Sequence, residues 1–309
     1  MERREFLRRL SLGLAAGWVE ARWSWPRPLA AAAPVWRLAL LADAHLKNGK
    51  ADRPEALALA RAVAEIRALR PAPDLVLFLG DLAHKGRPDA LDLGREILAD
   101  LPGSLHMLRG EGDWGPGGEA PWRRRFGEPW FSRSCGEAQV IGLDTTLTRT
   151  RRGPIFEIGA AQLSRLAREL AALSPETAII IASHAPLARL FRPWQHWTGD
   201  SAAVAAQFAR FPRVLCLHGH VHAAAGARVA MDGPPQAPGT WSRPPDAVAT
   251  TGSGGVMHCG LPATAWPRPL AVQGTPAIPR PGLGPHGCGW TLLTRDRVAA
   301  QLQPRLWQA

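Results

Sequence analysis

The chain has 309 residues, 46% of them hydrophobic, and a formal net charge of +11 at pH 7. This size and composition allow a substantial core and exclude a globally disordered chain. No window approaches about 18 uninterrupted apolar residues, so we predict no stable membrane span in the mature chain. The only dense basic block is residues 123–125, so we predict no specific nucleic-acid partner.

The first 33 residues have the pattern of an export signal. A charged start precedes the apolar stretch from Leu10 to Val19, and a run of alanines ends at Ala33. The core Arg3-Arg4-Glu5-Phe6-Leu7 is typical of the twin-arginine type. We therefore predict that residues 1–33 are a twin-arginine export signal, that the export machinery is a partner, and that the mature protein is periplasmic or secreted. An amphipathic N-terminal helix or an uncleaved anchor is the alternative.

The next part of the chain alternates between strands and helices. We predict strands at 36–42, 75–79 and 105–108, separated by helices at 54–70 and 89–100. The unbroken apolar run from Leu75 to Leu79 is typical of a strand buried on both faces. This alternation predicts right-handed crossover units in a parallel sheet.

The rest of the chain is predicted to continue the same domain, which spans residues 34–309. We predict strands at 131–135, 138–144, 178–182 and 214–217, helices at 160–173 and 201–211, and a closing hairpin of 290–294 and 297–302. Residues 234–289 are rich in proline and glycine, with twelve prolines by position 285, and predict an irregular segment. The four cysteines lack C-x-x-C spacing, although Cys259 and Cys288 could pair in an oxidising compartment.

Polar residues follow five of the predicted strands. Ligands of open α/β sheets bind beyond the carboxyl ends of the strands, so these residues are candidates for one site. Carboxylate and imidazole together suit Zn, Mn or Fe better than Ca. Two such ions about 3.5–4 Å apart can activate a water molecule and hold the oxygens of a phosphoryl group. The five motifs are Asp43-Ala44-His45, Gly80-Asp81, Gly110-Glu111-Gly112-Asp113, Ser183-His184 and Gly219-His220-Val221-His222.

This series resembles the calcineurin-like metallophosphoesterase superfamily. The superfamily pattern is Asp-x-His, Gly-Asp-x-x, Gly-Asn-His-Asp/Glu, a strand-terminal His and Gly-His-x-His, and the match runs from Val35 to His222. The stretch from Gly80 to Gly86 is similar to the bacterial cyclic-nucleotide phosphodiesterase-like branch. The resemblance implies an α/β fold with a two-sheet β-sandwich core flanked by helices, in four layers α/β/β/α.

The resemblance also implies a dinuclear metal centre of two divalent or trivalent ions (Mn, Fe or Zn). Asp43, His45 and His222 would hold one metal. Glu111, His184 and His220 would hold the other, and Asp81 would bridge the two. The implied activity is hydrolysis of a phosphomonoester or phosphodiester by a bridging hydroxide, and the implied partner is a small phosphate ester.

The chain departs from the superfamily pattern at Gly110-Glu111-Gly112-Asp113. Glu111 replaces the Asn ligand, and Gly112 replaces the His that resembles a general acid, which leaves Asp113 without a His to orient. The sequence therefore leaves the catalytic proton donor unassigned, and a metal-binding protein with reduced or lost catalysis is the alternative function. His84 is either an additional metal ligand, a replacement proton donor, or a residue outside the metal site.

The Glu111 replacement also changes the expected charge of the centre. Two carboxylates and one hydroxide against two divalent ions leave a net charge of +1, whereas a third carboxylate makes the sum zero. A neutral centre should attract a phosphate less strongly and tolerate a trivalent ion better.

Overall fold

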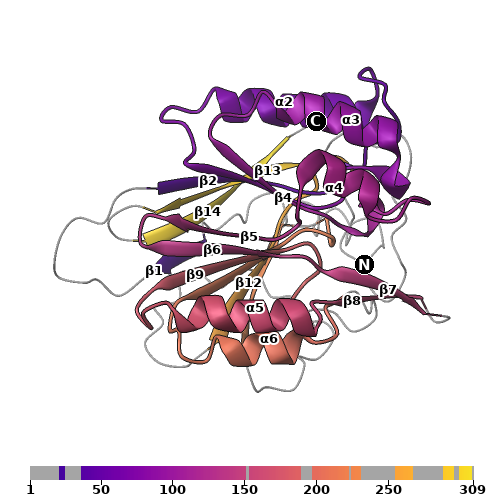
Figure 1. Ribbon diagram of the computed structural model, residues 1–309. Helices are drawn as coiled ribbons and strands as arrows, with labels where there is room; N and C mark the ends of the chain where they lie inside the picture. Colours follow the sequence, from indigo (N-terminus) through magenta and orange to yellow (C-terminus); the bar gives the residue numbers. More distant parts are fainter. Residues whose placement is uncertain are drawn as a thin grey trace, which may run out of the picture.

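Two β-sheets packed face to face form the centre of the molecule, with helices on both outer faces (Figure 1). This is a computed structural model, which describes residues 21–24, 36–150, 153–188, 197–222, 224–230, 255–266, 288–295 and 299–307. The predicted two-sheet, four-layer α/β/β/α fold is confirmed.

The first sheet combines three parallel strands with an antiparallel hairpin. The parallel strands β2, β3 and β4 pair in that order, and the hairpin of β13 and β14 adds to β2. The sheet order is β1 (Ala21–Ser24), β14 (Ala299–Leu306), β13 (Gly289–Arg295), β2 (Trp36–Leu41), β3 (Leu75–Leu79) and β4 (Ser104–Leu108). β1 lies within the predicted export signal, so removal of residues 1–33 would leave β14 as the edge strand.

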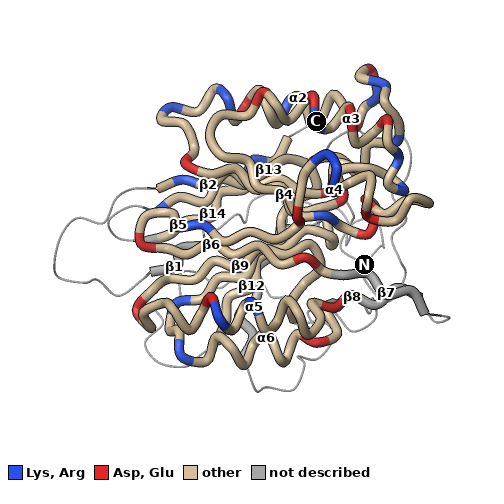
Figure 2. Tube along the Cα trace, viewed as in Figure 1, with Lys and Arg blue, Asp and Glu red and all other residues tan. Residues whose placement is uncertain are grey.

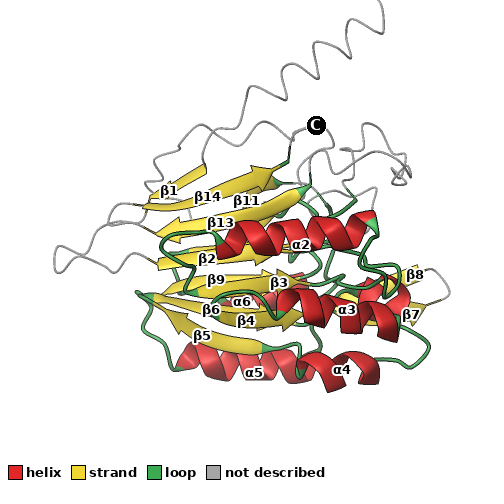
Figure 3. Cartoon of the chain, turned by 90° about the horizontal axis from the view of Figure 1, so that it is seen from above, coloured by secondary structure: helices red, strands yellow, loops and turns green. Residues whose placement is uncertain are grey.

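Helices α2 (Pro54–Arg67) and α3 (Pro88–Leu98) join the parallel strands and cover the outer face of this sheet (Figure 3). Each helix begins at a proline, whose fixed φ suits the first helical turn. One face of α2, including Leu59 and Ile66, is buried against the sheet. The short helix α4 (Ala120–Phe126), which was not predicted, extends this layer.

The second sheet is also mixed, and α5 (Ala160–Ala171) and α6 (Ser201–Gln207) cover its outer face. Its order is β11 (Ala225–Ala230), β12 (Gly255–Gly260), β10 (Val214–His218), β9 (Ala178–Ser183), β6 (Ala138–Leu143) and β5 (Phe131–Cys135). A separate hairpin of β7 (Thr146–Thr150) and β8 (Gly153–Glu157) was not predicted, and neither was β11. The proline-rich segment contributes β12.

The burial of β3 shows how the core divides. Val76 and Phe78 pack in the cluster beneath α2 and α3, whereas Leu75, Leu77 and Leu79 pack in the cluster between the sheets. The prediction that this strand is buried on both faces is confirmed. Charged residues lie mostly on the helices and loops, as Figure 2 shows.

All four cysteines are buried free thiols, so Cys259 and Cys288 do not pair. Across the described ranges, no helix has the length and apolarity to cross a membrane.

Candidate metal centre

The candidate ligands follow the carboxyl ends of strands from both sheets. β2, β3 and β4 of the first sheet lead to Asp43 and His45, Asp81 and Glu111, respectively. β9 and β10 of the second sheet lead to His184 and to His220 and His222. The seven residues therefore meet where the carboxyl ends of the two packed sheets come together, rather than at the edge of a single sheet.

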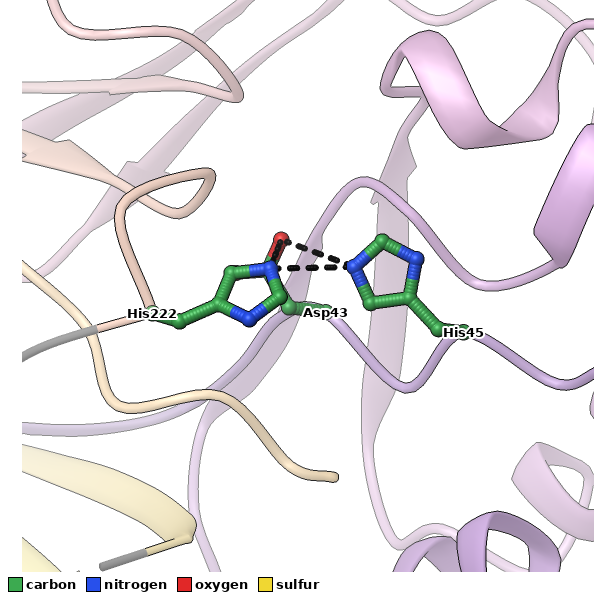
Figure 4. A group of neighbouring side chains, drawn as sticks. All are labelled: Asp43, His45 and His222. Atoms are coloured by element: carbon green, nitrogen blue, oxygen red, sulfur yellow. Dashed lines mark hydrogen bonds and ion pairs between the residues drawn. The ribbon is translucent and has the colours of Figure 1, made fainter. Parts of the chain in front are cut away.

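Asp43, His45 and His222 form the first cluster (Figure 4). The Nε2 atoms of His45 and His222 lie 3.0 Å apart, and Asp43 Oδ1 is 3.3 Å from His222 Nε2 and 3.9 Å from His45 Nε2. His222 Nδ1 donates to the carbonyl of Trp266 at 2.6 Å, so the Nε2 lone pair faces the cluster. A backbone carbonyl that fixes a His ring in this way is typical of metal ligands.

Glu111, His184 and His220 form the second cluster. The Glu111 carboxylate lies 2.7 Å from His184 Nε2 through Oε2 and 2.9 Å from His220 Nδ1 through Oε1. His184 Nδ1 donates to the carbonyl of Leu79 at 2.7 Å, so its Nε2 also faces the cluster. The ring of Phe156 packs edge-on against His220, with ring centroids 4.9 Å apart, and forms an apolar wall on this side.

Asp81 lies between the two clusters. Its Oδ2 is 3.4 Å from His45 Nε2, and its Oδ1 is 3.6 Å from His184 Nε2. Asp81 Oδ1 also accepts a hydrogen bond from the Gly112 backbone N–H at 2.6 Å. One carboxylate oxygen thus faces each cluster, which is the position that a bridging ligand needs.

The backbone at the candidate ligands is strained. A positive φ is uncommon in residues other than glycine, and it costs on the order of 1–3 kcal/mol at each position. Backbone hydrogen bonds hold these loops in place, including Asp43 N–H to Gly80 O at 3.0 Å and His45 N–H to Asp81 O at 2.9 Å. Five of the seven candidate ligands have positive φ, namely Asp43 (57°), His45 (49°), Asp81 (57°), His220 (65°) and His222 (54°).

The lone pairs that face one another in the site require a cation between them. Because His184 Nδ1 donates to a carbonyl, a neutral His184 would place its Nε2 lone pair 2.7 Å from an oxygen of Glu111. Burial alone would lower the pKa of His184, but Asp81 and Glu111 raise it well above its usual value. The site therefore holds a positive charge at this point, either a proton or a metal ion. Three carboxylates with imidazole nitrogens fit Zn, Mn or Fe.

The pKa values of two of the carboxyl groups, Glu111 and Asp81, are shifted in opposite directions. Burial alone would raise the pKa of Glu111, but His220 and His184 hold it well below its usual value. Burial together with the negative charge of Glu111 raises the pKa of Asp81 well above its usual value. Among the described residues, no lysine or arginine forms an ion pair with these carboxylates, so a metal ion is the natural counter-charge.

Two glycines permit this close packing. A Cβ atom at Gly110 would lie 2.2 Å from Asp81 Oδ1 and 2.6 Å from His184 Nε2. A Cβ atom at Gly112 would lie 2.9 Å from Asp81 Oδ1 and 3.0 Å from the carbonyl oxygen of Ala83. Gly112 therefore does more than omit a His side chain, because its backbone approaches Asp81 at a distance that a side chain would disturb.

Asp113 has no His to orient, as its sequence motif indicates, but it has another role in the structure. Its buried carboxylate accepts hydrogen bonds from the backbone N–H groups of Asp81 at 2.9 Å, Ala83 at 2.8 Å and Gly110 at 2.9 Å. Asp113 therefore joins the loop after β3 to the loop after β4. Sequence reasoning missed this role because the partners are backbone groups, which leave no mark on side-chain identity.

Two further residues frame the site without joining either cluster. His84 is exposed, belongs to neither cluster, and donates its backbone N–H to Leu46 O at 2.8 Å. Arg109 is 2% exposed, and its guanidinium binds Asp144 at 2.6 Å and Glu119 at 2.8 Å just before the Gly110–Asp113 loop. Burial alone would lower the pKa of Arg109, but Asp144 and Glu119 raise it, so this residue anchors the loop as a permanent cation.

Comparison with solved structures shows the same fold. The purple acid phosphatase PPD1 from yellow lupin (Lupinus luteus) is 16% identical, with a TM-score of 0.60, and the match covers 91% of this chain and 52% of that one. The chain therefore spans about half the length of this phosphatase. A dimetal phosphatase from Danio rerio is 16% identical, with a TM-score of 0.58 and coverage of 87% of this chain and 98% of that one. PhoD is 12% identical, with a TM-score of 0.57 and coverage of 91% and 67%.

A search of curated proteins gave no match. A family model described as calcineurin-like phosphoesterase matches residues 37–224, which is more than half of the chain. This range contains both clusters and Asp81. The chain therefore belongs to the calcineurin-like phosphoesterase family.

Proposed function

We propose that this protein is a metal-dependent phosphoesterase that hydrolyses a phosphomonoester or phosphodiester at a dinuclear centre. The observation that carries the proposal is the arrangement of two three-residue clusters with Asp81 facing both of them. Asp43, His45 and His222 would hold one ion, Glu111, His184 and His220 would hold the other, and Asp81 would bridge them. Two bound metal ions would supply Lewis acidity and activate a water molecule for attack on phosphorus.

The exposure of the ligands indicates from which side a substrate enters. The side chains of Glu111 and His45 are 26% and 16% exposed, whereas the other five candidate ligands are at most 2% exposed. A phosphate ester would therefore approach between Glu111 and His45. The buried ring of Phe156 packs against His220 and excludes water from that side of the second cluster.

Departure of the leaving group is the step of the proposed reaction for which the site has no assigned general acid. Loss of a general acid costs about 10²–10⁴-fold in rate, and most for leaving groups of high pKa. Gly112 has no side chain to donate a proton, and His84 lies outside both clusters. The proposed activity therefore favours substrates with good leaving groups. A metal-binding protein that has lost catalysis is the second candidate, and it rests on the same glycine.

Metal analysis and hydrolysis assays separate the two candidates. We would measure the metal content of the purified mature chain and assay aryl phosphate monoesters and diesters with Mn, Zn and Fe. Two bound ions with turnover of nitrophenyl esters would support the phosphoesterase. Bound metal without turnover of any ester would favour the second candidate. Retention of both metal and activity by an Asp81→Asn variant would contradict the dinuclear centre itself.

The replacement of Asn by Glu111 gives a separate test of the charge argument. Glu111→Asn restores the site charge of +1 and should tighten phosphate binding and raise turnover with divalent ions. Glu111→Ala removes the ligand as well as the charge, and it serves as the control. If the Asn variant loses as much metal as the Ala variant and gains no activity, the charge argument is wrong.

We also propose that the chain is exported through the twin-arginine machinery and that the mature protein is periplasmic or secreted. The proposal rests on Arg3-Arg4-Glu5-Phe6-Leu7 and the apolar stretch that follows it. This route carries folded proteins, so it suits a protein that loads its metal before export. Fractionation of cells that express wild type and an Arg3→Lys/Arg4→Lys double variant tests it. Equal export of both proteins would contradict the proposal.

A further inference from the structure

The distribution of lysine in this chain is uneven. The chain has 37 lysines and arginines, but only three of them are lysines, namely Lys47, Lys50 and Lys85. All three lie in the loops that follow β2 and β3, which are the loops that carry Asp43, His45 and Asp81. Every other basic residue is an arginine, so lysine occurs only in these two segments of the chain.

The two loops run side by side from the metal centre to these lysines. His45 N–H donates to Asp81 O and Leu46 N–H donates to Leu82 O, both at 2.9 Å, and His84 N–H donates back to Leu46 O at 2.8 Å. Lys47 and Lys85 come directly after this pairing, one on each loop. Both are exposed, and Lys47 follows two residues after His45, which is one of the two ligands open to solvent.

The contacts of these two lysines leave their charges unneutralised. The Lys47 ammonium lies 3.9 Å above the ring of Trp266, whose carbonyl holds His222. In the part of the chain that the structure describes, neither lysine forms an ion pair with a carboxylate, whereas nearby Arg87 pairs with Asp89 at 2.9 Å. Burial lowers the pKa of His84, and the charges of Lys85 and Lys47 lower it further, so both ammonium groups act on the surface around His84.

We propose that Lys47 and Lys85 form an anion subsite, which we call the lysine rim, and that it binds a second anionic group carried by the leaving group of the substrate. This inference rests on the proposed phosphoesterase function and names its substrate class. The scissile phosphate would lie at the metals, and a carboxylate or phosphate farther along the substrate would lie at the rim. Lysine suits this role because its ammonium is a mobile point charge with three donors.

The lysine rim would also supply the positive charge that the metal centre lacks because of Glu111. With Glu111 present, the proposed centre is neutral when two divalent ions and a hydroxide are bound, so it attracts an anion less than a positive centre does. Two ammonium groups that have no carboxylate partner among the described residues would restore that attraction and direct it toward substrates with an additional negative charge.

Binding of non-hydrolysable phosphonates tests the lysine rim. We would measure the affinity of the metal-loaded protein for phenylphosphonate, 4-carboxyphenylphosphonate and 1,4-phenylenebisphosphonate by calorimetry. The wild type should bind the two probes that carry a second anionic group more tightly than phenylphosphonate. Each of Lys47→Gln and Lys85→Gln should reduce that preference about fivefold, the size of one charge pair at contact distance in water. A preference for only one of the two probes identifies whether the second anion is a carboxylate or a phosphate.

Lys50→Gln is the matched control, because it removes the same charge from the same loop. Lys50 follows Gly49, whose N–H binds Asp89, and it is not among the charges that act on His84. It should keep the wild-type preference. An unchanged preference in the Lys47→Gln/Lys85→Gln double variant, or an equal loss in Lys50→Gln, would overturn the lysine rim.

The phosphonate measurement is independent of turnover. If the metal-loaded protein hydrolyses no aryl phosphate, the proposed function fails, but the binding preference still tests the rim. The preference should also fall as salt concentration rises in the wild type and stay flat in the double variant.

Discussion

Removal of the Asp113 carboxylate should destabilise the protein more than any single change at the surface. The carboxylate is 2% exposed and accepts three backbone N–H groups at 2.8–2.9 Å. Asp113→Ala leaves all three donors buried without a partner, and each unsatisfied donor costs about 1–3 kcal/mol. We therefore expect a loss of about 3–9 kcal/mol in the free energy of unfolding, a large part of the 5–15 kcal/mol that is typical of a domain.

Asp113→Asn should lower the free energy of unfolding by less than Asp113→Ala does. Oδ2 of Asp113 accepts from Asp81 and Gly110, and Oδ1 accepts from Ala83. Asp113→Asn can keep one oxygen toward the first two donors, so it should lose about 1–3 kcal/mol from the remaining donor. Burial raises the pKa of Asp113 to about 7, so the neutral amide also avoids the cost of a buried charge.

Urea unfolding of the metal-free protein measures both changes. Metal-free protein is used so that lost metal binding does not add to the result. Asp74→Ala is the control, because Asp74 also accepts a backbone N–H, from Arg37 at 2.7 Å, but at an exposed position. We expect a loss of less than about 1 kcal/mol there. If Asp113→Ala costs no more than Asp74→Ala, Asp113 does not hold the two loops together.

Three other predictions concern the site and its support. Gly110→Ala should abolish metal binding by calorimetry while the circular dichroism spectrum stays native, because its Cβ would lie 2.2 Å from Asp81 Oδ1; Gly117→Ala, whose Cβ meets only Pro121 at 3.1 Å, should bind metal normally. Chelation should lower the melting temperature, since a ligand at 100 times its Kd stabilises a protein by about 2.7 kcal/mol, and an unchanged melting temperature would exclude a bound metal. Arg109→Lys should cost about 2–4 kcal/mol in unfolding free energy, because lysine cannot reproduce the forked contact with a buried carboxylate; a loss below 1 kcal/mol would contradict this.

The order of the elements was predictable because its signals are local. Apolar runs such as Leu75–Leu79 mark buried strands, and the proline at position 54 marks the first turn of a helix. The elements that prediction missed are short. The hairpin of β7 and β8 and the helix α4 have no apolar periodicity long enough to indicate a regular element. Helix ends were displaced by a few residues, as at α6, which ends at Gln207.

The sequence by itself determined the types of side chain at the site and their positions after the strands. It indicated Asp43, Asp81 and His184 because strand-end motifs are local in the chain. Only the tertiary structure decided how these residues share the site, because residues as distant as His45 and His222 meet when the two sheets pack together. The structure alone also showed what Asp113, Gly112 and the Trp266 carbonyl do. Their roles depend on backbone hydrogen bonds across long sequence separations, and side-chain identity does not encode such contacts.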